Sequence, residues 1–238
     1  DSLGGNVFGV LLDYGQNLDV VNLFESDFYK DYCARLYDYN QKGYISADAS
    51  TDTTAVGELV KAGTLMSYTT GGKPGIKAQE TTLTGRDMTI FQTLDDYIGS
   101  TSVAGMPWTI PISAQHKEAA MKFLNECYSN ADVANLLAWG IEGTHYKIGD
   151  DGLATYADGV DASNSGWNHS MGWMMPNQFL THVWEGNDPD LWDKMRDFNN
   201  NAKVSKASGF SFDSTNVANE ITAVQNVYNE YQTSVEYG

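Results

Sequence analysis

Apolar positions along the chain follow two patterns, helical spacing in some segments and short continuous runs in others. The helical pattern repeats every three to four residues, begins at capping residues and in several cases ends at glycine. It predicts helices from Ser26 to Gly43, around Val56–Val60 as far as Gly63, around Ala120–Tyr128, from Asn130 to Gly140, from Asp188 to Phe198 and from Asp213 to Val235. We interpret the apolar stripe of the last helix as core packing.

The short apolar runs predict strands at 6–12, 65–68 and 87–91. Segment 104–112 is expected to be extended, because its two prolines exclude a helix. Asp151-Gly152, between 146–148 and 153–156, predicts a hairpin. Strands alternate with helices and the chain finishes in helices, which is typical of an α/β protein.

The composition fits a folded protein of one or two domains. The chain has 238 residues, of which 42% are hydrophobic and 19% charged, and this excludes disorder. Lysine and arginine number 14 against 31 acidic residues, so the formal net charge is −17. Nucleic acids and anionic membrane surfaces are therefore poor partners. No apolar run approaches the roughly 18 residues of a membrane span.

The sequence has no strong catalytic or metal-binding motif. A phosphate-binding loop, a dinucleotide fingerprint, HExxH and a nucleophile elbow are all missing, and the histidines lack metal-ligand spacing. We expect no catalytic residue, no metal and no cofactor. Cys33 and Cys127 fall on apolar stripes of predicted helices, where a buried thiol is more common than a disulfide.

The placement of the tryptophans is the distinctive feature of the sequence. Trp139 and Trp192 lie on helical stripes and are interpreted as core residues, whereas Trp184 fits either a core or a binding site. Trp108 lies between two prolines in the extended segment. Trp167 lies with further aromatic and amide residues in the polar stretch 165–178.

This polar stretch contains both kinds of side chain that bind sugars. Trp167 and Trp173 alternate with Asn168, Asn177 and Gln178. Flat rings stack on the apolar faces of sugars, and planar amides pair with hydroxyl groups. The combination predicts a sugar-binding wall. The alternative is that the rings fill a core and the amides cap helices.

Several blocks resemble a known family. They are LGGNVFGVLLD and VVNLFESDFYKDY within 2–45, VANLLAWGIEGTHY at 133–146, GWMMPNQ and WEGNDP within 171–189, and the tail at 209–213. These blocks resemble the extracellular solute-binding proteins of carbohydrate-type ABC importers, in particular the LipO-like lipoproteins of Gram-positive bacteria. The resemblance extends over essentially the whole chain.

The resemblance implies a two-lobed periplasmic-binding-protein fold of the second type, with the ligand between the lobes. By analogy, 1–102 and 146–238 would belong to the C-terminal lobe. Residues 103–145 would cross the hinge and add a segment of the N-terminal lobe, most of which would lie outside this chain. Family members carry a lipoprotein signal and a lipid-bearing cysteine, which this chain lacks. The full-length protein would be an extracellular, cell-surface lipoprotein that attaches to the membrane through that anchor.

The resemblance also adds candidate binding residues. The family often places an aromatic residue in the cleft at the turn after 65–68, and here that turn offers Tyr68 and Lys73. Trp108 would lie near the hinge, and 167–178 would line the wall of the second lobe.

We therefore expect a non-catalytic component that captures an oligosaccharide and delivers it to an ABC permease. One alternative is a fragment of a carbohydrate-active hydrolase, which needs a pair of facing carboxylates. Another is a non-catalytic glycan-binding or structural surface domain. A purely structural domain requires Trp108, Trp167 and Trp173 to be packed, with no cleft beside them.

Overall fold

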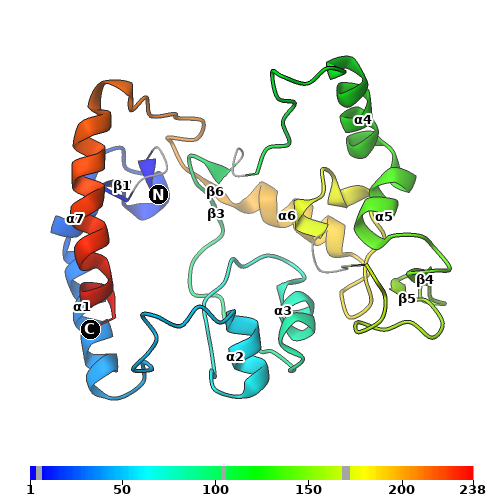
Figure 1. Ribbon diagram of the computed structural model, residues 1–238, viewed down its shortest axis with the longest axis horizontal. Helices are drawn as coiled ribbons and strands as arrows, with labels where there is room; N and C mark the ends of the chain where they lie inside the picture. Colours follow the sequence, from blue (N-terminus) through cyan, green and yellow to red (C-terminus); the bar gives the residue numbers. More distant parts are fainter. Residues whose placement is uncertain (4–6, 103–105, 168–171, 238) are drawn as a thin grey trace. The chain divides into compact units, whose positions relative to one another are not determined.

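The computed structural model describes residues 1–3, 7–102, 106–167 and 172–237 (Figure 1). The chain divides into two compact units. The first contains Asp1–Ala55, Asp95–Gly105 and Ala202–Gly238, and the second contains Val56–Leu94 and Met106–Asn201. The domain boundaries expected from the sequence, after residues 102 and 145, stay a prediction.

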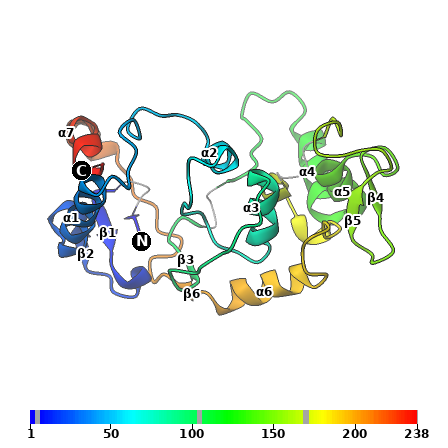
Figure 2. The same cartoon turned by 90° about the horizontal axis from the view of Figure 1, so that it is seen from below.

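The first unit contains two small sheets. Its elements are β1 (Gly9–Leu11), η2 (Asp13–Gly15), β2 (Val20–Asn22), η3 (Leu23–Glu25), α1 (Asp27–Gln41), β3 (Tyr97–Ile98), β6 (Lys203–Val204), η7 (Thr215–Val217) and α7 (Ala218–Glu236). Strands β1 and β2 pair antiparallel, with Val10 opposite Val21. Strands β3 and β6, which Figure 2 places side by side, pair parallel. Sequence-distant segments thus form one unit.

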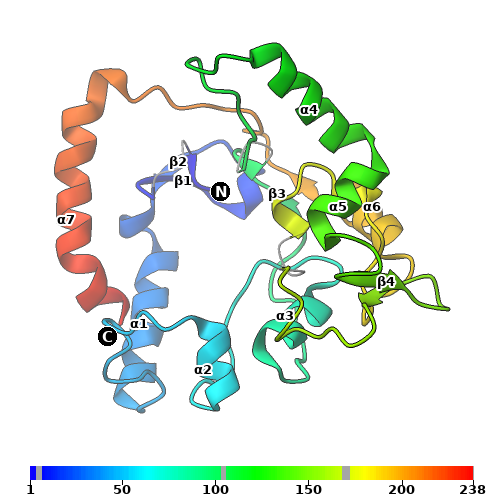
Figure 3. The same ribbon diagram turned by 45° about the vertical axis from the view of Figure 1, so that its right-hand side comes forward.

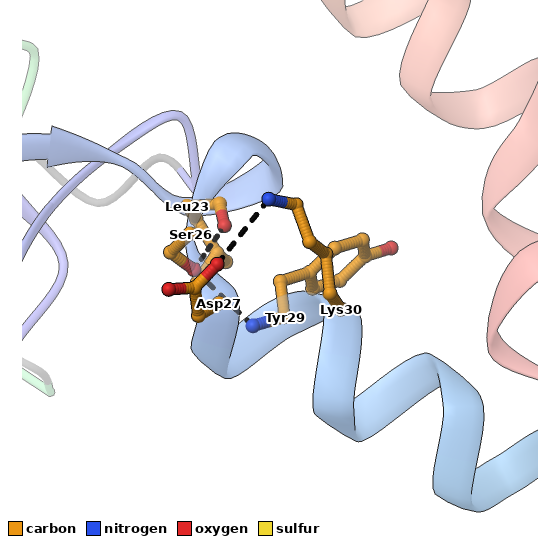
Figure 4. A network of polar contacts seen from close by, with 5 residues as sticks. All are labelled: Leu23, Ser26, Asp27, Tyr29 and Lys30. Carbon is orange, nitrogen blue, oxygen red and sulfur yellow. Dashed lines mark hydrogen bonds and ion pairs between the residues drawn. The ribbon is translucent and has the colours of Figure 1, made fainter.

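Helix α1 begins as the sequence predicts. The Ser26 hydroxyl accepts a hydrogen bond from the backbone N–H of Tyr29 (3.2 Å) and donates to the carbonyl of Leu23 (2.5 Å), as Figure 4 shows. The exposed ion pair between Lys30 and Asp27 (3.3 Å) flanks this cap. Such a cap contributes about 1 kcal/mol to helix stability.

Aromatic rings join α1 and α7 in the first unit. The ring centroid of Phe24 lies 4.9 Å from Tyr29 in an edge-on arrangement and 5.5 Å from Tyr228. The Tyr29 hydroxyl donates to Glu236 at the end of α7 (3.2 Å). Most of the α7 stripe nevertheless remains exposed, and no residue of the helix is buried. The interpretation of this stripe as core is therefore wrong, since only one side of it meets these rings.

The second unit contains the remaining helices and one hairpin. Its elements are α2 (Val56–Ala62), α3 (Ile76–Thr84), α4 (Lys117–Ser129), α5 (Ala131–Trp139), β4 (Tyr146–Ile148), β5 (Ala154–Tyr156), η5 (Gly172–Met174), η6 (Gln178–Leu180) and α6 (Leu191–Asn201). Figure 3 shows α4 followed directly by α5, with β4 close by. A buried cluster joins α5 to the hairpin through Trp139, Tyr146 and Ala154.

Local signals predicted this unit well. Asn130 caps α5 by accepting from the N–H groups of Asp132 and Val133, and Gly140 ends the helix. The predicted hairpin is confirmed, with Tyr146 opposite Tyr156. Two helix starts are later than expected. In this unit Asp188 accepts from the N–H of Asp190, and α6 starts at Leu191. In the first unit Asp213 accepts from the N–H of Thr215, and η7 precedes α7, which starts at Ala218.

Two predicted strands, 65–68 and 87–91, are wrong. Both segments lie outside helices and strands. Their polar contacts go to α3: Tyr68 donates to the Glu80 carboxylate, and the N–H of Met88 donates to the Thr81 hydroxyl (3.2 Å). An apolar run becomes a strand only where another strand pairs with it. None does so here in the part of the chain that the structure describes.

The cysteines are free thiols. Cys127 is fully buried, and burial raises the pKa of its thiol, whereas Cys33 is half-buried. In the described ranges, no helix has both the length and the apolar character needed to cross a bilayer.

Replacing Gly140 should destabilise the second unit. Gly140 has φ 84° and ψ −146°, a conformation that essentially only glycine adopts, and an added Cβ would lie 2.6 Å from Nδ1 of His145. Gly140→Ala should lower the free energy of unfolding by about 2 kcal/mol or more. All six tryptophans lie in the second unit, so urea unfolding followed by tryptophan fluorescence measures this change.

Gly71→Ala is the matched control. Gly71 has an ordinary φ, and nothing lies within 4 Å of the added Cβ. Its effect should not exceed about 1 kcal/mol in either direction. Equal stability of the Gly140 and Gly71 variants would contradict the strain argument.

Candidate functional site

Segment 180–185 holds the site together. It bridges in parallel to β5: the N–H of Ala154 donates to the carbonyl of Val183, and the N–H of Glu185 donates to the carbonyl of Ala154, both at 2.8 Å. From the other side, the indole N–H of Trp139 on α5 donates to the carbonyl of His182 (3.1 Å). The position of Trp184 relative to Trp139 is thereby fixed.

The side chain of buried Asn135 on α5 makes three hydrogen bonds. One stays within α5, and two go to segment 180–185. Its amide nitrogen donates to the carbonyls of Ala131 (2.8 Å) and Leu180 (3.3 Å), and its amide oxygen accepts from the N–H of His182 (2.8 Å). Both ends of one amide are used, which makes Asn135 a positioning residue.

The indoles gather around a cavity of about 490 Å³ in the second unit. The ring centroids of Trp139 and Trp184 lie 4.9 Å apart, and Tyr156 meets Trp184 edge-on at 5.1 Å. Trp192 is held by an indole N–H bond to the carbonyl of Thr181 (2.7 Å). All four rings line the cavity, whose volume suits a small-molecule ligand.

Helix α3 and the turn before it form another part of the wall. Ala78, Gln79 and Thr82 of the helix line the cavity, together with Lys73 and Gly75 of the turn. Gly75 has φ 82°, and a Cβ on it would lie 2.9 Å from Oδ1 of Asn187 and 3.0 Å from Leu191. This close approach lets the turn pack against the start of α6.

A buried carboxylate stands behind this wall. Glu80 accepts hydrogen bonds from the hydroxyl of Tyr68 and from the side chain of Gln79 (3.1 Å). Burial and this hydrogen bond raise the pKa of Tyr68 to about 12. Burial lowers the pKa of Lys73, while the charge of Glu80 opposes that shift. Tyr68 therefore holds α3 in place rather than lining the cavity.

Four of the predicted binding residues line this cavity: Lys73, Trp167, Trp173 and Gln178. Trp167 and Trp173 are 39% and 43% exposed, so their rings are not sealed in a core. The Gln178 side chain is half-buried and has no hydrogen-bond partner within the described residues. Asn168 lies outside the described residues.

Trp108 and Asn177 lie at a second, smaller hollow of about 250 Å³, which Trp173 and Gln178 also line. Trp108 is 42% exposed. The Asn177 amide donates to the carbonyl of Tyr128 (2.9 Å) and accepts from the N–H of Phe179 (3.2 Å), so its main contacts are internal.

Sequence reasoning missed several lining residues. Trp139 and Trp192 were interpreted as core. Trp139 is only 7% exposed and Trp192 is half-buried, but both also border the cavity. Glu185 and Asn187 stand in the WEGNDP block, which the resemblance singled out without assigning them a role. The contribution of α3 had no local signal. Among the described residues, no group of three or more His, Cys, Asp or Glu side chains could hold a metal ion.

The chain has the fold of the type II periplasmic-binding-protein class. It corresponds to about half the length of a solved structure with this fold. The same fold is seen in the crystal structure of an N-glycan transport solute-binding protein, NgtS, from Streptococcus pneumoniae. It matches the whole chain with a TM-score of 0.79 at 21% identity, over 52% of its own length. NgtS in complex with Man1GlcNAc matches 97% of the chain with a TM-score of 0.80 at 22% identity, over 51% of its length. The expected fold class is confirmed.

A sequence relative supports the resemblance. A carbohydrate ABC transporter substrate-binding protein of Streptococcus pneumoniae serotype 4 (strain ATCC BAA-334 / TIGR4) is 26% identical over 229 residues, which cover 94% of this chain and 45% of the relative. The chain spans about half the length of the relatives it matches. Residues 206–238 match a family described as a domain of unknown function, DUF3502. The resemblance to a carbohydrate-type solute-binding protein is confirmed.

Removing the Asn135 amide should destabilise the site. Asn135→Ala leaves the N–H of His182 and the carbonyl of Leu180 without these partners, which should cost about 1–3 kcal/mol. Urea unfolding followed by tryptophan fluorescence measures the loss. Asn125→Ala, at an exposed position of α4, should change stability by less than about 0.5 kcal/mol. Equal effects of the two substitutions would disprove the positioning role.

Proposed function

We propose that this chain contributes a glycan-binding wall to the solute-binding component of an ABC importer. In this proposal, the 490 Å³ cavity captures part of a neutral oligosaccharide, which is then delivered to the permease. The observation that carries it is the exposure of Trp167 and Trp173 at the rim of a cavity that also has an amide, Gln178. The rings would stack on apolar sugar faces while the amide pairs with hydroxyl groups.

The relatives support the same ligand class. NgtS has been crystallised in complex with Man1GlcNAc and with Man5GlcNAc, the latter structure matching this chain with a TM-score of 0.76 at 22% identity, over 50% of that chain. We extend this to the present chain as an N-glycan-like, neutral oligosaccharide. The full-length protein would be a lipoprotein at the cell surface, and this chain would act outside the cell as part of it.

The charge of the cavity favours binding over hydrolysis. Glycoside hydrolases generally need two carboxyl groups on either side of the scissile bond. Glu185 is the one carboxylate among the described residues that line the cavity, and Lys73 is the one amine. We therefore propose reversible capture without turnover. A purely structural role fits poorly, because it required Trp108, Trp167 and Trp173 to be packed.

Loss of either rim indole should weaken glycan binding. Trp167→Ala and Trp173→Ala should each lower the affinity for Man5GlcNAc about tenfold, which corresponds to about 1.4 kcal/mol, because a stacking face is removed. Isothermal titration calorimetry on the full chain measures the dissociation constants. Phe91→Ala is the control, since Phe91 is 82% exposed in the same unit and does not line the cavity.

The control variant should bind as the unaltered chain does. If neither indole variant differed from Phe91→Ala, the proposed site would be wrong. If the unaltered chain bound no neutral glycan in a broad glycan screen, the proposed function would be wrong as well.

A further inference from the structure

The smaller hollow adjoins the main cavity in the second unit. Its volume is about 250 Å³, and Trp173 and Gln178 line both spaces. Sites for drug-sized ligands measure about 300–1,000 Å³, so the smaller hollow suits a single sugar ring rather than a whole oligosaccharide. The two spaces therefore share part of their wall.

The ring of Trp108 is held in place at this hollow. Its indole N–H donates to the carbonyl of Met174 at 3.0 Å, yet 42% of the residue remains exposed. The Asn177 bond to the carbonyl of Tyr128 fastens the neighbouring residues to the end of α4, and its bond from the N–H of Phe179 fixes its own side chain. An indole fixed at its polar edge and open at its surface is ready to stack, because little rotamer freedom remains to be lost on binding.

The hollow also differs from the main cavity in charge. Lys73 and Glu185 line the main cavity, whereas no Lys, Arg, His, Asp or Glu lines the hollow among the described residues. A charged group placed there would lose its hydration without gaining an ionic partner. The chemistry therefore favours an uncharged sugar residue.

We propose that the smaller hollow is a second subsite, which binds an outer, neutral sugar residue of the captured oligosaccharide on Trp108. The inference rests on the proposed function and deepens it: longer neutral glycans are preferred because Trp108 and Trp173 bind successive parts of one chain. Trp108 then determines glycan length, whereas Trp167 belongs to the main cavity alone.

The test compares two glycans that differ in length, Man1GlcNAc and Man5GlcNAc. Calorimetry on the full chain gives both dissociation constants, and the readout is the ratio of the two affinities. The unaltered chain should bind Man5GlcNAc more tightly, and Trp108→Ala should lower the ratio about tenfold. Trp108→Phe, which keeps a ring but loses the N–H bond to Met174, should lower it less than threefold.

Ile112→Ala provides the control, because Ile112 is 91% exposed, lies four residues after Trp108 and does not line the hollow. It should leave the ratio unchanged. A second measurement uses the unaltered chain, in case Trp108→Ala does not fold. Saturation-transfer NMR with Man5GlcNAc, irradiating aromatic protons, should saturate an outer mannose as well as the sugar in the main cavity.

The outcomes separate this inference from the proposed function. Binding of neither glycan by the unaltered chain would overturn the second subsite, and the proposed function would be overturned as well if the broad glycan screen showed no neutral glycan bound. Binding of both glycans with equal affinity, or an affinity ratio in Trp108→Ala equal to that of Ile112→Ala, would overturn the second subsite and leave the proposed function standing. Saturation confined to one sugar would have the same consequence.

Discussion

The hydrogen bonds that hold segment 180–185 between α5 and β5 are the constraint on which the site depends. Two backbone bonds at Ala154 and the indole N–H bond of Trp139 place Trp184 against Trp139. Asn135 fixes the same segment from within α5. Of the rings that line the cavity, Trp139 is therefore part of the buried cluster of the second unit and Trp184 packs against that cluster. A ligand would meet a surface that folding has already ordered, which reduces the entropy lost on binding.

Local signals predicted local structure because their physics is local. Ser26 and Asn130 cap helices through their own side chains, and Asp151-Gly152 lies in the turn of the hairpin between Ile148 and Ala154. The strand predicted at 65–68 failed because strand formation depends on a distant partner, and Tyr68 instead contacts Glu80 on α3. The stripe of α7 has helical periodicity, but periodicity alone does not say what covers a helix face.

The candidate site likewise has a part that local sequence patterns predict and a part that they do not. The sequence identified Trp167, Trp173 and Gln178, because rings among amides in a polar stretch are a local pattern. It separated core tryptophans from binding-site tryptophans, and Trp139 shows that this division is too sharp. One face of an indole can pack while the other edge borders a cavity. The wall from α3 depends on the approach of Gly75 to Asn187 and Leu191, more than a hundred positions away, which no local pattern contains.

The net charge of the protein and the charge of the residues that line the cavity have different consequences. Every ion pair among the described residues joins exposed side chains, where such pairs contribute little to stability. The formal charge of −17 thus acts mainly on solubility and on the exclusion of anionic partners. At the cavity, Lys73 and Glu185 nearly balance, and uncharged rings and amides make most of the lining. In the proposed function, discrimination among neutral solutes would come from ring stacking and hydroxyl geometry, since the wall offers little net charge. A solute with many hydroxyl groups and apolar ring faces would meet both requirements, so the acidic character of the chain does not conflict with the proposed binding of a neutral sugar.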